Sequence, residues 1–455
     1  MREYDLDVLI IGGGGSGGFT AATTALKSGA RVGMVEAGRL GGLCILAGCM
    51  PSKTLLHEAA LIREQKVSGD EEYPRVHKRV TSVVEYLAGK RVEAVRAKED
   101  QGLKLFQGRA RFVDPHTLEV NGRRLTGAKI VIATGSIEII PPVPGLGKAG
   151  YLDSAKFMDM PELPSSLAVL GGGTMALELS QFAVRMGVKT YLIQRSPGLL
   201  SKEAPEVGQI LKQALAEEGV KIFTDTQLIR LAAGPEGKTV VFNQGGQEDH
   251  VVAQEALLAL GRRANTDGLN LEAAGVATEK GAVKVDRFMR TSAGHIFAAG
   301  DVTGVNMVLN LAVLQGETAG YNATHEPARE IDDSVLPRAV FTDPQFARVG
   351  LNRREAEAAG LDFLEASYSL EGMGVARTYP KPLKGFMAMR AAAEDGRILG
   401  AEIVAPEASL LIHDTAVAMK LGGRPQDLAE LPYIHPCLSE LTNLCAGRLA
   451  NKLGR

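Results

Sequence analysis

Two cysteines in a glycine-rich segment are the residues of this sequence with the clearest potential for chemistry. Cys44 and Cys49 are separated by four residues, and Lys53 follows them closely. A disulfide between them would close a very short ring, and strained disulfides are the reducible, catalytic kind. Pro51 suits the first turn of a helix, which would place Cys49 at a helix N-terminus, where the dipole favours a thiolate. The spacing therefore predicts a dithiol that cycles to a disulfide beside a bound redox cofactor.

Two other interpretations of this cysteine pair are a structural one and a metal site. The pair could be two buried structural cysteines, or half of a zinc site. Zinc needs about four ligands, and the nearest histidine, His57, has no second cysteine pair beside it. We therefore expect no metal.

A βαβ unit at the N-terminus is expected to position the cysteines and bind a dinucleotide. The apolar run 8–11 is typical of a buried strand, residues 19–28 of a helix, and residues 30–35 of a second strand that ends in Glu36. Between the first two elements lies the glycine run 12–18, interrupted only by Ser16. Such glycines let the backbone meet a pyrophosphate at a helix N-terminus, and the terminal acid bonds a ribose hydroxyl. Two registers fit: Gly12/Gly14/Gly17 or Gly13/Gly15/Gly18.

A second unit of the same kind opens at residue 167 and implies a second dinucleotide. Strand 167–170 leads to a glycine turn, a helix to residue 186 and a strand 190–193. Gln194 stands where an acid would favour NAD, and Arg195 follows it. This pair permits NADP, or Gln194 bonds the ribose of NAD and Arg195 is solvated. The cofactor-binding residues predicted here are Gly171, Gly173, Met175, Gln194 and Arg195.

Composition limits the class of protein. The 455 residues are 45% apolar, with mean hydropathy +0.01 and a net charge of −2. This is the composition of a soluble globular chain of several domains, and it gives no reason to expect nucleic acid or a membrane as partner. Four cysteines do not make a disulfide scaffold, so we expect a reducing, cytoplasmic location.

The cysteine segment with its flanks, Gly-Gly-x-Cys-x-x-x-Gly-Cys-x-Pro-Ser-Lys, resembles the signature of the class I FAD-dependent pyridine nucleotide–disulfide oxidoreductases. That family includes dihydrolipoamide dehydrogenase, glutathione reductase and mercuric reductase, and five motifs fall in its order. The resemblance implies an α/β fold with two Rossmann-like domains, for FAD and NAD(P), and an α+β C-terminal dimerisation domain. The expected boundaries are 1–150 and 271–335 for the FAD domain, 151–270 for the NAD(P) domain and 336–455 for the interface domain.

The resemblance also implies which residues hold FAD. The family form Gly-x-Gly-Ser-Gly-Gly favours the second glycine register. Asp301 is expected to bond the ribityl chain, the turn at Thr134 to pack on the dinucleotide, and Gly261 to lie in the turn that returns to the FAD domain. The full implied set for FAD and this turn is Gly13, Gly15, Ser16, Gly17, Gly18, Glu36, Lys53, Ala110, Thr134, Gly135, Gly261, Asp301 and Met307.

The catalytic roles follow from the same resemblance. Cys49 would contact the flavin and Cys44 would exchange with substrate. Lys53 and Glu178 would pair beside the flavin, and His435 with Glu440 would reach in from the partner subunit of a homodimer with shared active sites. A histidine supplies a proton acceptor near neutral pH, and a carboxylate can orient its ring.

Two further cysteines lie near the C-terminus. Cys437 replaces the threonine of the family's His-Pro-Thr-x-x-Glu motif, either as a small core residue or as an extra thiol within reach of substrate. We expect Cys445 to be buried and inert.

Three functions stay open. The first is a dihydrolipoamide dehydrogenase-like enzyme acting on a small or protein-bound lipoyl-type disulfide, because residues 51–57 look closest to that branch. The second is a reductase of Hg(II) or another low-molecular-weight disulfide. The third is a flavin-binding subunit without turnover, in which Gln194 and Asn310, which stands where dihydrolipoamide dehydrogenases usually carry histidine, are drift.

Three helical stretches complete the prediction. Residues 55–97 have a helical pattern that a polar stretch, 68–74, is expected to interrupt, and no chemistry is predicted there. Residues 307–319 and 410–421 are also expected to be helical.

Overall fold

The computed structural model describes residues 4–326 and 328–454. The chain forms two compact units. Unit one contains 1–54, 75–140 and 261–333, and unit two contains 55–74, 141–260 and 334–455. The chain passes between the units after Thr54, Pro74, Ile140, Leu260 and Asp333.

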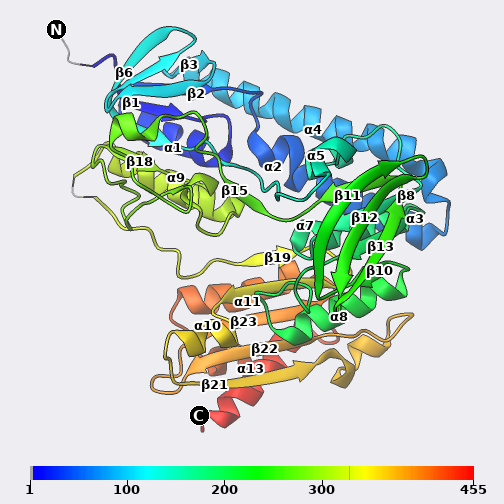
Figure 1. Ribbon diagram of the computed structural model, residues 1–455. Helices are drawn as coiled ribbons and strands as arrows, with labels where there is room; N and C mark the ends of the chain where they lie inside the picture. The colour runs from blue at the N-terminus through cyan, green and yellow to red at the C-terminus, as the bar shows by residue number, and fades with distance from the viewer. Residues whose placement is uncertain (1–3, 327, 455) are drawn as a thin grey trace. The chain divides into compact units, whose positions relative to one another are not determined.

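Unit one is built on a twisted sheet with a parallel centre (Figure 1). The strand order is β3-β2-β1-β6-β5-β4, and β18 pairs with β6. Val8 lies opposite both Val32 and Lys129, and the central strands are buried apolar runs, as strands covered on both faces must be. The strands are β1 (Leu6–Ile11), β2 (Val32–Glu36), β3 (Lys104–Gln107), β4 (Ala110–Asp114), β5 (Thr117–Val120), β6 (Arg123–Ile132) and β18 (Ile296–Ala298).

Helices α1 (Ser16–Lys27) and α9 (Leu309–Asn322) pack against each other through glycines. A Cβ on Gly316 would lie 2.2 Å from the Gly17 carbonyl oxygen, and one on Gly320 would lie 2.4 Å from that of Ala21. Only glycine allows so close an approach of two helix backbones. This contact fixes the N-terminus of α1. The short elements of unit one are β7 (Ser136–Glu138), β15 (Arg262–Ala264), β16 (Thr278–Glu279), β17 (Ala282–Val283), η1 (Leu271–Ala274) and η2 (Asp301–Thr303).

Three helices follow β2: α2 (Gly42–Ala47), α3 (Cys49–Gln65) and α4 (Gly69–Glu99). The expected interruption at 68–74 is wrong in extent, because α4 already begins at Gly69 and contains Pro74. Pro74 lies in the second turn of α4, past the N–H groups that have no partner within the helix, so its ring removes one helix hydrogen bond near the N-terminus.

Unit two carries the second βαβ unit and a second large sheet. The parallel sheet has the order β10-β9-β8-β14, and β11-β12-β13 form a three-stranded antiparallel sheet. Their bounds are β8 (Ser166–Leu170), β9 (Lys189–Ile193), β10 (Lys221–Phe223), β11 (Thr226–Gly234), β12 (Gly237–Gln244), β13 (Gln247–Ala253) and β14 (Glu255–Leu258), with helices α5 (Leu146–Ala149), α6 (Ser154–Met158), α7 (Thr174–Arg185) and α8 (Pro205–Glu217).

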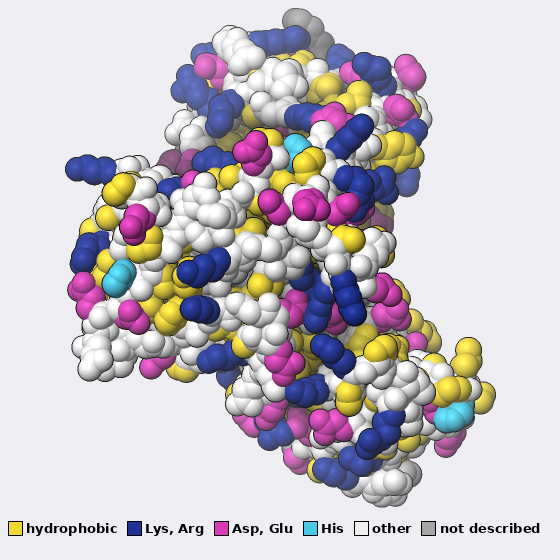
Figure 2. All heavy atoms as spheres, turned by 90° about the vertical axis from the view of Figure 1, so that its right-hand side faces the viewer, with side chains coloured by type: hydrophobic (Ala, Val, Ile, Leu, Met, Phe, Trp, Pro, Cys, Tyr) yellow, Lys and Arg dark blue, Asp and Glu magenta, His cyan; other side chains and the backbone are white. Residues whose placement is uncertain are grey.

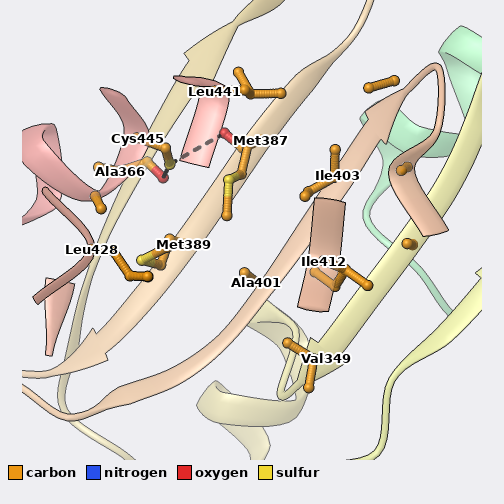
Figure 3. Close-up of a cluster of buried hydrophobic side chains, with 14 of the residues drawn as sticks. Val349, Ala366, Met387, Met389, Ala401, Ile403, Ile412, Leu428, Leu441 and Cys445 are labelled. Carbon is orange, nitrogen blue, oxygen red and sulfur yellow. Dashed lines mark hydrogen bonds between the residues drawn. The ribbon is translucent and has the colours of Figure 1, made fainter. Parts of the chain in front are cut away.

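The C-terminal part of unit two is an antiparallel sheet of order β19-β20-β23-β22-β21 with helices packed on it. Figure 3 shows its core, in which Cys445 lies among Met387, Leu441 and Ala366. The bounds are β19 (Arg338–Val340), β20 (Gln345–Gly350), β21 (Phe363–Ser369), β22 (Phe386–Ala392), β23 (Ile398–Ala405), α10 (Arg353–Ala358), η3 (Leu370–Gly372), η4 (Val375–Arg377), α11 (Ala408–Lys420), α12 (Pro425–Ala429) and α13 (Glu440–Lys452).

The surface carries charges of both signs. In the face seen in Figure 2, Lys and Arg side chains are interspersed with Asp and Glu, in keeping with a net charge of −2. Within the described residues no helix is long and apolar enough to cross a membrane.

Candidate active site

The two cysteines of the glycine-rich segment both belong to unit one and lie on consecutive helices. Cys44 is in the middle of α2, Gly48 interrupts the helix, and Cys49 is the first residue of α3. The Ser52 N–H donates to the Gly48 carbonyl (3.1 Å). Cys49 therefore lies at a helix N-terminus, as expected, where the dipole favours a thiolate.

The surroundings of Cys44 favour the protonated form of its thiol. A hydrogen bond with Cys49, burial and the negative charge of a Cys49 thiolate together raise the pKa of Cys44 well above its usual value. Cys44 therefore keeps its proton near neutral pH. Both side chains are half-exposed, so neither sulfur is sealed from a reactant.

Gly42 brings this dithiol against the first dinucleotide loop. Gly42 has φ +64, and a Cβ there would lie 2.5 Å from the Gly15 Cα. Gly15 is the N-cap residue of α1, and its own Cβ would meet no atom closer than 3.9 Å. The cysteine helix therefore starts at the helix N-terminus that is expected to hold a pyrophosphate.

In the first glycine loop, the glycines that the backbone requires do not coincide with either expected register. Gly12 makes the tight turn with φ +83, although the preferred register leaves it out. A Cβ on Gly18 would lie 2.3 Å from the Gly12 carbonyl oxygen, so Gly18 allows the helix to pack on the turn. No side chain caps α1, which leaves its N-terminal N–H groups for an anion. The four consecutive glycines were the signal that Gly12 has a role.

The acid at the end of β2 is held in place by backbone groups. Gly14 N–H donates to Glu36 Oε2 and Gly38 N–H to Glu36 Oε1, both at 2.8 Å. Each carboxylate oxygen can accept a further bond, so a ribose hydroxyl remains compatible with this arrangement. The loop, the uncapped helix and the acid fit a dinucleotide.

Asp301 lies in a polar network that the sequence did not indicate. Ser136 Oγ donates to Asp301 Oδ2 (2.6 Å), and Arg262 Nε donates to Ser136 Oγ (2.8 Å). Arg262 also donates to the Ser136 carbonyl (2.7 Å) and to Glu138 (2.5 Å). These bonds join β7 to β15, the two strands beside the passages between the units.

The turn at Thr134 is fixed by the chain segment that returns from unit two. Thr134 Oγ1 donates to the Asn265 carbonyl (2.6 Å), and Asn265 N–H donates to the Gly135 carbonyl (2.9 Å). A Cβ on Gly135 would meet nothing within 4 Å. Ala110 begins β4 and is buried, Gly261 adjoins β15, and Met307 lies outside α9, just before it.

The second glycine turn has the same design. Gly171 has φ +128, and a Cβ there would lie 2.3 Å from the Ala259 carbonyl oxygen. A Cβ on Gly173, the N-cap of α7, would meet nothing within 4 Å. No side chain caps α7. Gln194 follows β9 with its side chain against Gly172, and Arg195 is exposed. Met175, in the first turn of α7, is half-buried. This glycine turn and the uncapped N-terminus of α7 also fit a dinucleotide.

Glu178, on α7, is fully buried and accepts a hydrogen bond from Phe341 N–H (2.9 Å). Lys53 belongs to unit one and Glu178 to unit two, so their pairing stays a prediction.

His435 and Glu440 are brought together within unit two. His435 Nδ1 lies 2.8 Å from Glu440 Oε1, and Cys437 N–H donates to Glu440 Oε2 (3.0 Å). The hydrogen bond with His435 lowers the pKa of Glu440. The His435 side chain is 78% exposed.

The two remaining cysteines differ sharply. The Cys437 thiol contacts the Ile434 carbonyl and Ser439 Oγ, both at 2.8 Å, two residues from His435. Cys445 is fully buried, as expected, and burial raises the pKa of its thiol to about 12. No cluster of three or more potential metal ligands (His, Cys, Asp or Glu) occurs in 4–326 and 328–454.

Comparison with known proteins places this site in a family. Residues 6–316 match the model of the pyridine nucleotide-disulphide oxidoreductases, and residues 336–445 match the dimerisation domain of the same family. The chain belongs to the pyridine nucleotide-disulphide oxidoreductase family. Its cofactors are accordingly FAD and NAD or NADP.

Relatives carry several activities. The chain is 32% identical to a mercuric reductase of Staphylococcus aureus (95% of this chain, 81% of the relative) and 33% identical to a dihydrolipoyl dehydrogenase of Thermus scotoductus (97% and 96%). Its structure resembles that of the HOCl-induced flavoprotein disulfide reductase RclA from Escherichia coli, with TM-score 0.86, 28% identity, and coverage of 97% of this chain and 99% of the other. The family and the α/β fold with a dimerisation domain are thus confirmed.

Proposed function

We propose that this protein passes two electrons between NAD(P)H and a lipoyl-type disulfide or dithiol through FAD and the Cys44–Cys49 pair. The observation that carries the proposal is the dithiol itself. Cys49 lies at the N-terminus of α3. Helix α2, which carries Cys44, starts at Gly42, and Gly42 lies against Gly15 of the first glycine loop. When bound, FAD supplies the exchange of a hydride with the nicotinamide.

The chain's own residues would divide the remaining work. Cys49 holds the thiolate next to the cofactor, and Cys44 exchanges with the substrate. Because the pKa of Cys44 is raised by its neighbour, and only a thiolate attacks a disulfide, exchange at Cys44 needs a proton acceptor. His435, oriented by Glu440, is the candidate, supplied by the partner subunit of a homodimer.

The other expected assignments belong to the same proposal. Gly13, Gly15, Ser16, Gly17, Gly18, Glu36 and Asp301 would hold FAD, and Gly171, Gly173, Met175, Gln194 and Arg195 would hold the nicotinamide dinucleotide. Lys53 would pair with Glu178. The division into FAD, NAD(P) and interface domains at the expected boundaries and a cytoplasmic location stay predictions.

A second candidate is reduction of Hg(II), favoured by one observation. The Cys437 thiol lies two residues from His435 and is not sealed in the core, so it could add a soft ligand to the exchanging pair. Mercuric reductases and dihydrolipoyl dehydrogenases both occur among the relatives at similar identity.

The test is a substrate panel on purified holoenzyme. We would measure kcat/KM for lipoamide, glutathione disulfide and Hg(II) with NADH and with NADPH. The proposal expects the highest value with lipoamide, and a Cys437→Ser variant should leave that value within about twofold because Cys437 takes no part. Dominant Hg(II) turnover that Cys437→Ser abolishes would replace it with the second candidate. Bound flavin without any turnover would leave a non-catalytic subunit.

A further inference from the structure

Helix α7 holds the segment 341–343, which joins β19 to β20, by side-chain hydrogen bonds to its backbone. The Phe341 N–H donates to Glu178 Oε1 (2.9 Å). Gln181 uses both ends of its amide on one residue: its Oε1 accepts from the Asp343 N–H (2.8 Å), and its Nε2 donates to the Asp343 carbonyl (2.9 Å). Glu178 and Gln181 are three positions apart, on one face of the helix. The helix belongs to unit two, as does the segment.

Charged groups further along the same helix face complete this contact. Arg185, four positions after Gln181, donates to Asp343 Oδ2 (2.8 Å) and to both oxygens of Glu218 (2.7 Å each). Gln181 Nε2 also donates to Glu218 Oε1 (3.0 Å). The side chains of Arg185 and Glu218 are only 4% and 7% exposed. Three side chains of α7, at positions 178, 181 and 185, therefore face the segment 341–343.

Glu178 and Gln181 are buried, so their hydrogen bonds are costly to lose. Glu178 is fully buried and Gln181 is 1% exposed. Removal of one partner from a buried hydrogen bond leaves the other unsatisfied, at a cost above the net value of the bond. Burial on α7 does not by itself provide a partner. Ser180, next to Gln181, is also fully buried, and its Oγ has no hydrogen-bond partner among the described residues.

The bond from Phe341 has a consequence for the Glu178 carboxylate. The last torsion of a glutamate side chain is broad, so the plane of the carboxylate can turn unless hydrogen bonds fix it. The Phe341 N–H fixes it only while the segment 341–343 keeps its place, and Gln181 holds that segment two residues further on. A change at Gln181 therefore reaches Glu178 through the backbone of the segment.

We propose that Gln181 is a positioning residue for hydride transfer between NAD(P)H and the flavin, which acts by fixing the Phe341 N–H and thereby the orientation of the Glu178 carboxylate. The inference rests on the proposed function, in which Glu178 pairs with Lys53 beside the flavin. In the step concerned NAD(P)H loses a hydride with both of its electrons, and the flavin gains it. Gln181 gives and takes no proton or electron.

The first test measures the contact itself and needs no turnover. Hydrogen exchange of backbone amides is followed in the holoenzyme by mass spectrometry with overlapping peptides. Gln181→Met has a side chain of similar length without a hydrogen-bonding amide, and it should speed exchange at Phe341 about tenfold, the size of one lost buried hydrogen bond. Ser180→Ala is the matched control and should change nothing. Exchange at Val169, within β8, should stay as in the wild type; an equal rise there, or no rise at Phe341, would overturn the proposal.

The second test is a double-mutant cycle on the rate of flavin reduction by NADH or NADPH, measured by stopped flow without oxygen or a disulfide. Glu178→Gln removes the charge and keeps an acceptor for the Phe341 N–H. Glu178→Gln and Gln181→Met should each slow flavin reduction about tenfold, whereas the double variant should be less than about twofold slower than Glu178→Gln. Losses that multiply to about a hundredfold, or a Gln181→Met enzyme with the wild-type rate, would overturn the proposal. Ser180→Ala should keep the wild-type rate.

A second variant and a separate assay keep the outcome decisive. Gln181→Asn keeps an amide and shortens its reach, so it replaces Gln181→Met in both tests if that variant does not retain FAD. Neither test uses a disulfide, so failure of this inference is distinguishable from failure of the proposed function. If lipoamide is not turned over while the cycle shows the coupling, the proposed function fails and the role of Gln181 stands. If lipoamide is turned over and the two changes act independently, the proposed function stands and Gln181 is only structural.

Discussion

Replacement of Glu440 by glutamine tests the role of the His435–Glu440 pair. The histidine nitrogen lies 2.8 Å from Glu440 Oε1, and the Cys437 N–H donates to Oε2. Glutamine has one carbonyl oxygen, so it removes the charge and keeps the acceptor of only one of these two bonds. A hydrogen bond to a charged group contributes about 1.5–3 kcal/mol. The side chains of His435 and Glu440 are 78% and 23% exposed, so solvent screening reduces this to about 1 kcal/mol.

That free energy corresponds to roughly a fivefold loss in the rate of thiol–disulfide exchange, because the imidazolium that receives the proton is less stabilised. The assay compares NAD(P)H-driven disulfide reduction with NAD(P)H oxidation by ferricyanide, which does not require thiol exchange. Glu440→Gln should slow the first about fivefold and leave the second unchanged. Glu430→Gln, an exposed acid nearby in the sequence, is the matched control and should change neither.

The effect of Glu440→Gln should also change with pH in one direction. The pKa of Glu440 is lowered by His435, so the carboxylate is charged at every pH above its ordinary value of about 4.5. The ratio of wild-type to variant rates should approach one once the pH falls below the lowered pKa, because Glu440 is then as neutral as glutamine. An equal loss in both assays, or a ratio that grows at low pH, would refute the reasoning.

Three further predictions concern the two glycine loops that are expected to bind dinucleotides and the buried core around Cys445. Gln194→Glu should shift the ratio of kcat/KM for NADPH to that for NADH about tenfold towards NADH, because a carboxylate repels a 2′-phosphate; no shift would remove Gln194 from cofactor selection. Gly18→Ala should lower retention of FAD through dialysis, because the new Cβ would lie 2.3 Å from the Gly12 carbonyl, whereas Gly29→Ala, which meets no atom within 4 Å but has φ +78, controls for a general loss of stability. Cys445→Ala should destabilise the protein by about 1 kcal/mol by leaving a small cavity, measured by denaturant unfolding, with disulfide reduction unchanged; lost activity in a folded variant would show that Cys445 is not inert.

The sequence predicted those parts of the site that local patterns determine. An apolar run followed by glycines, such as the one that ends at Ile11, indicates a buried strand and a turn. A proline two residues after Cys49 indicates the start of a helix. The helix that starts at Cys49 and the strand ends at Glu36 and Gln194 appear in the structure where the sequence predicted them.

Long-range polar contacts could not be predicted in this way. Ser136 meets Arg262, 126 residues later, and Asp301, 165 residues later, and nothing local to either segment indicates the pairing. Arg91 lies in a charged helical stretch in which one more arginine is unremarkable. Only the structure shows that its guanidinium carbon lies 4.3 Å from the centroid of the Phe19 ring.

The most direct test of the central claim is a thiol count before and after reduction by NAD(P)H. Purified, air-oxidised holoenzyme is incubated with or without NAD(P)H, denatured and alkylated, and the labelled peptides are mapped. The account predicts that one additional pair of thiols appears on reduction and that it maps to Cys44 and Cys49, with Cys437 and Cys445 labelled equally in both samples. No increase, or an increase that maps to Cys437, would contradict it.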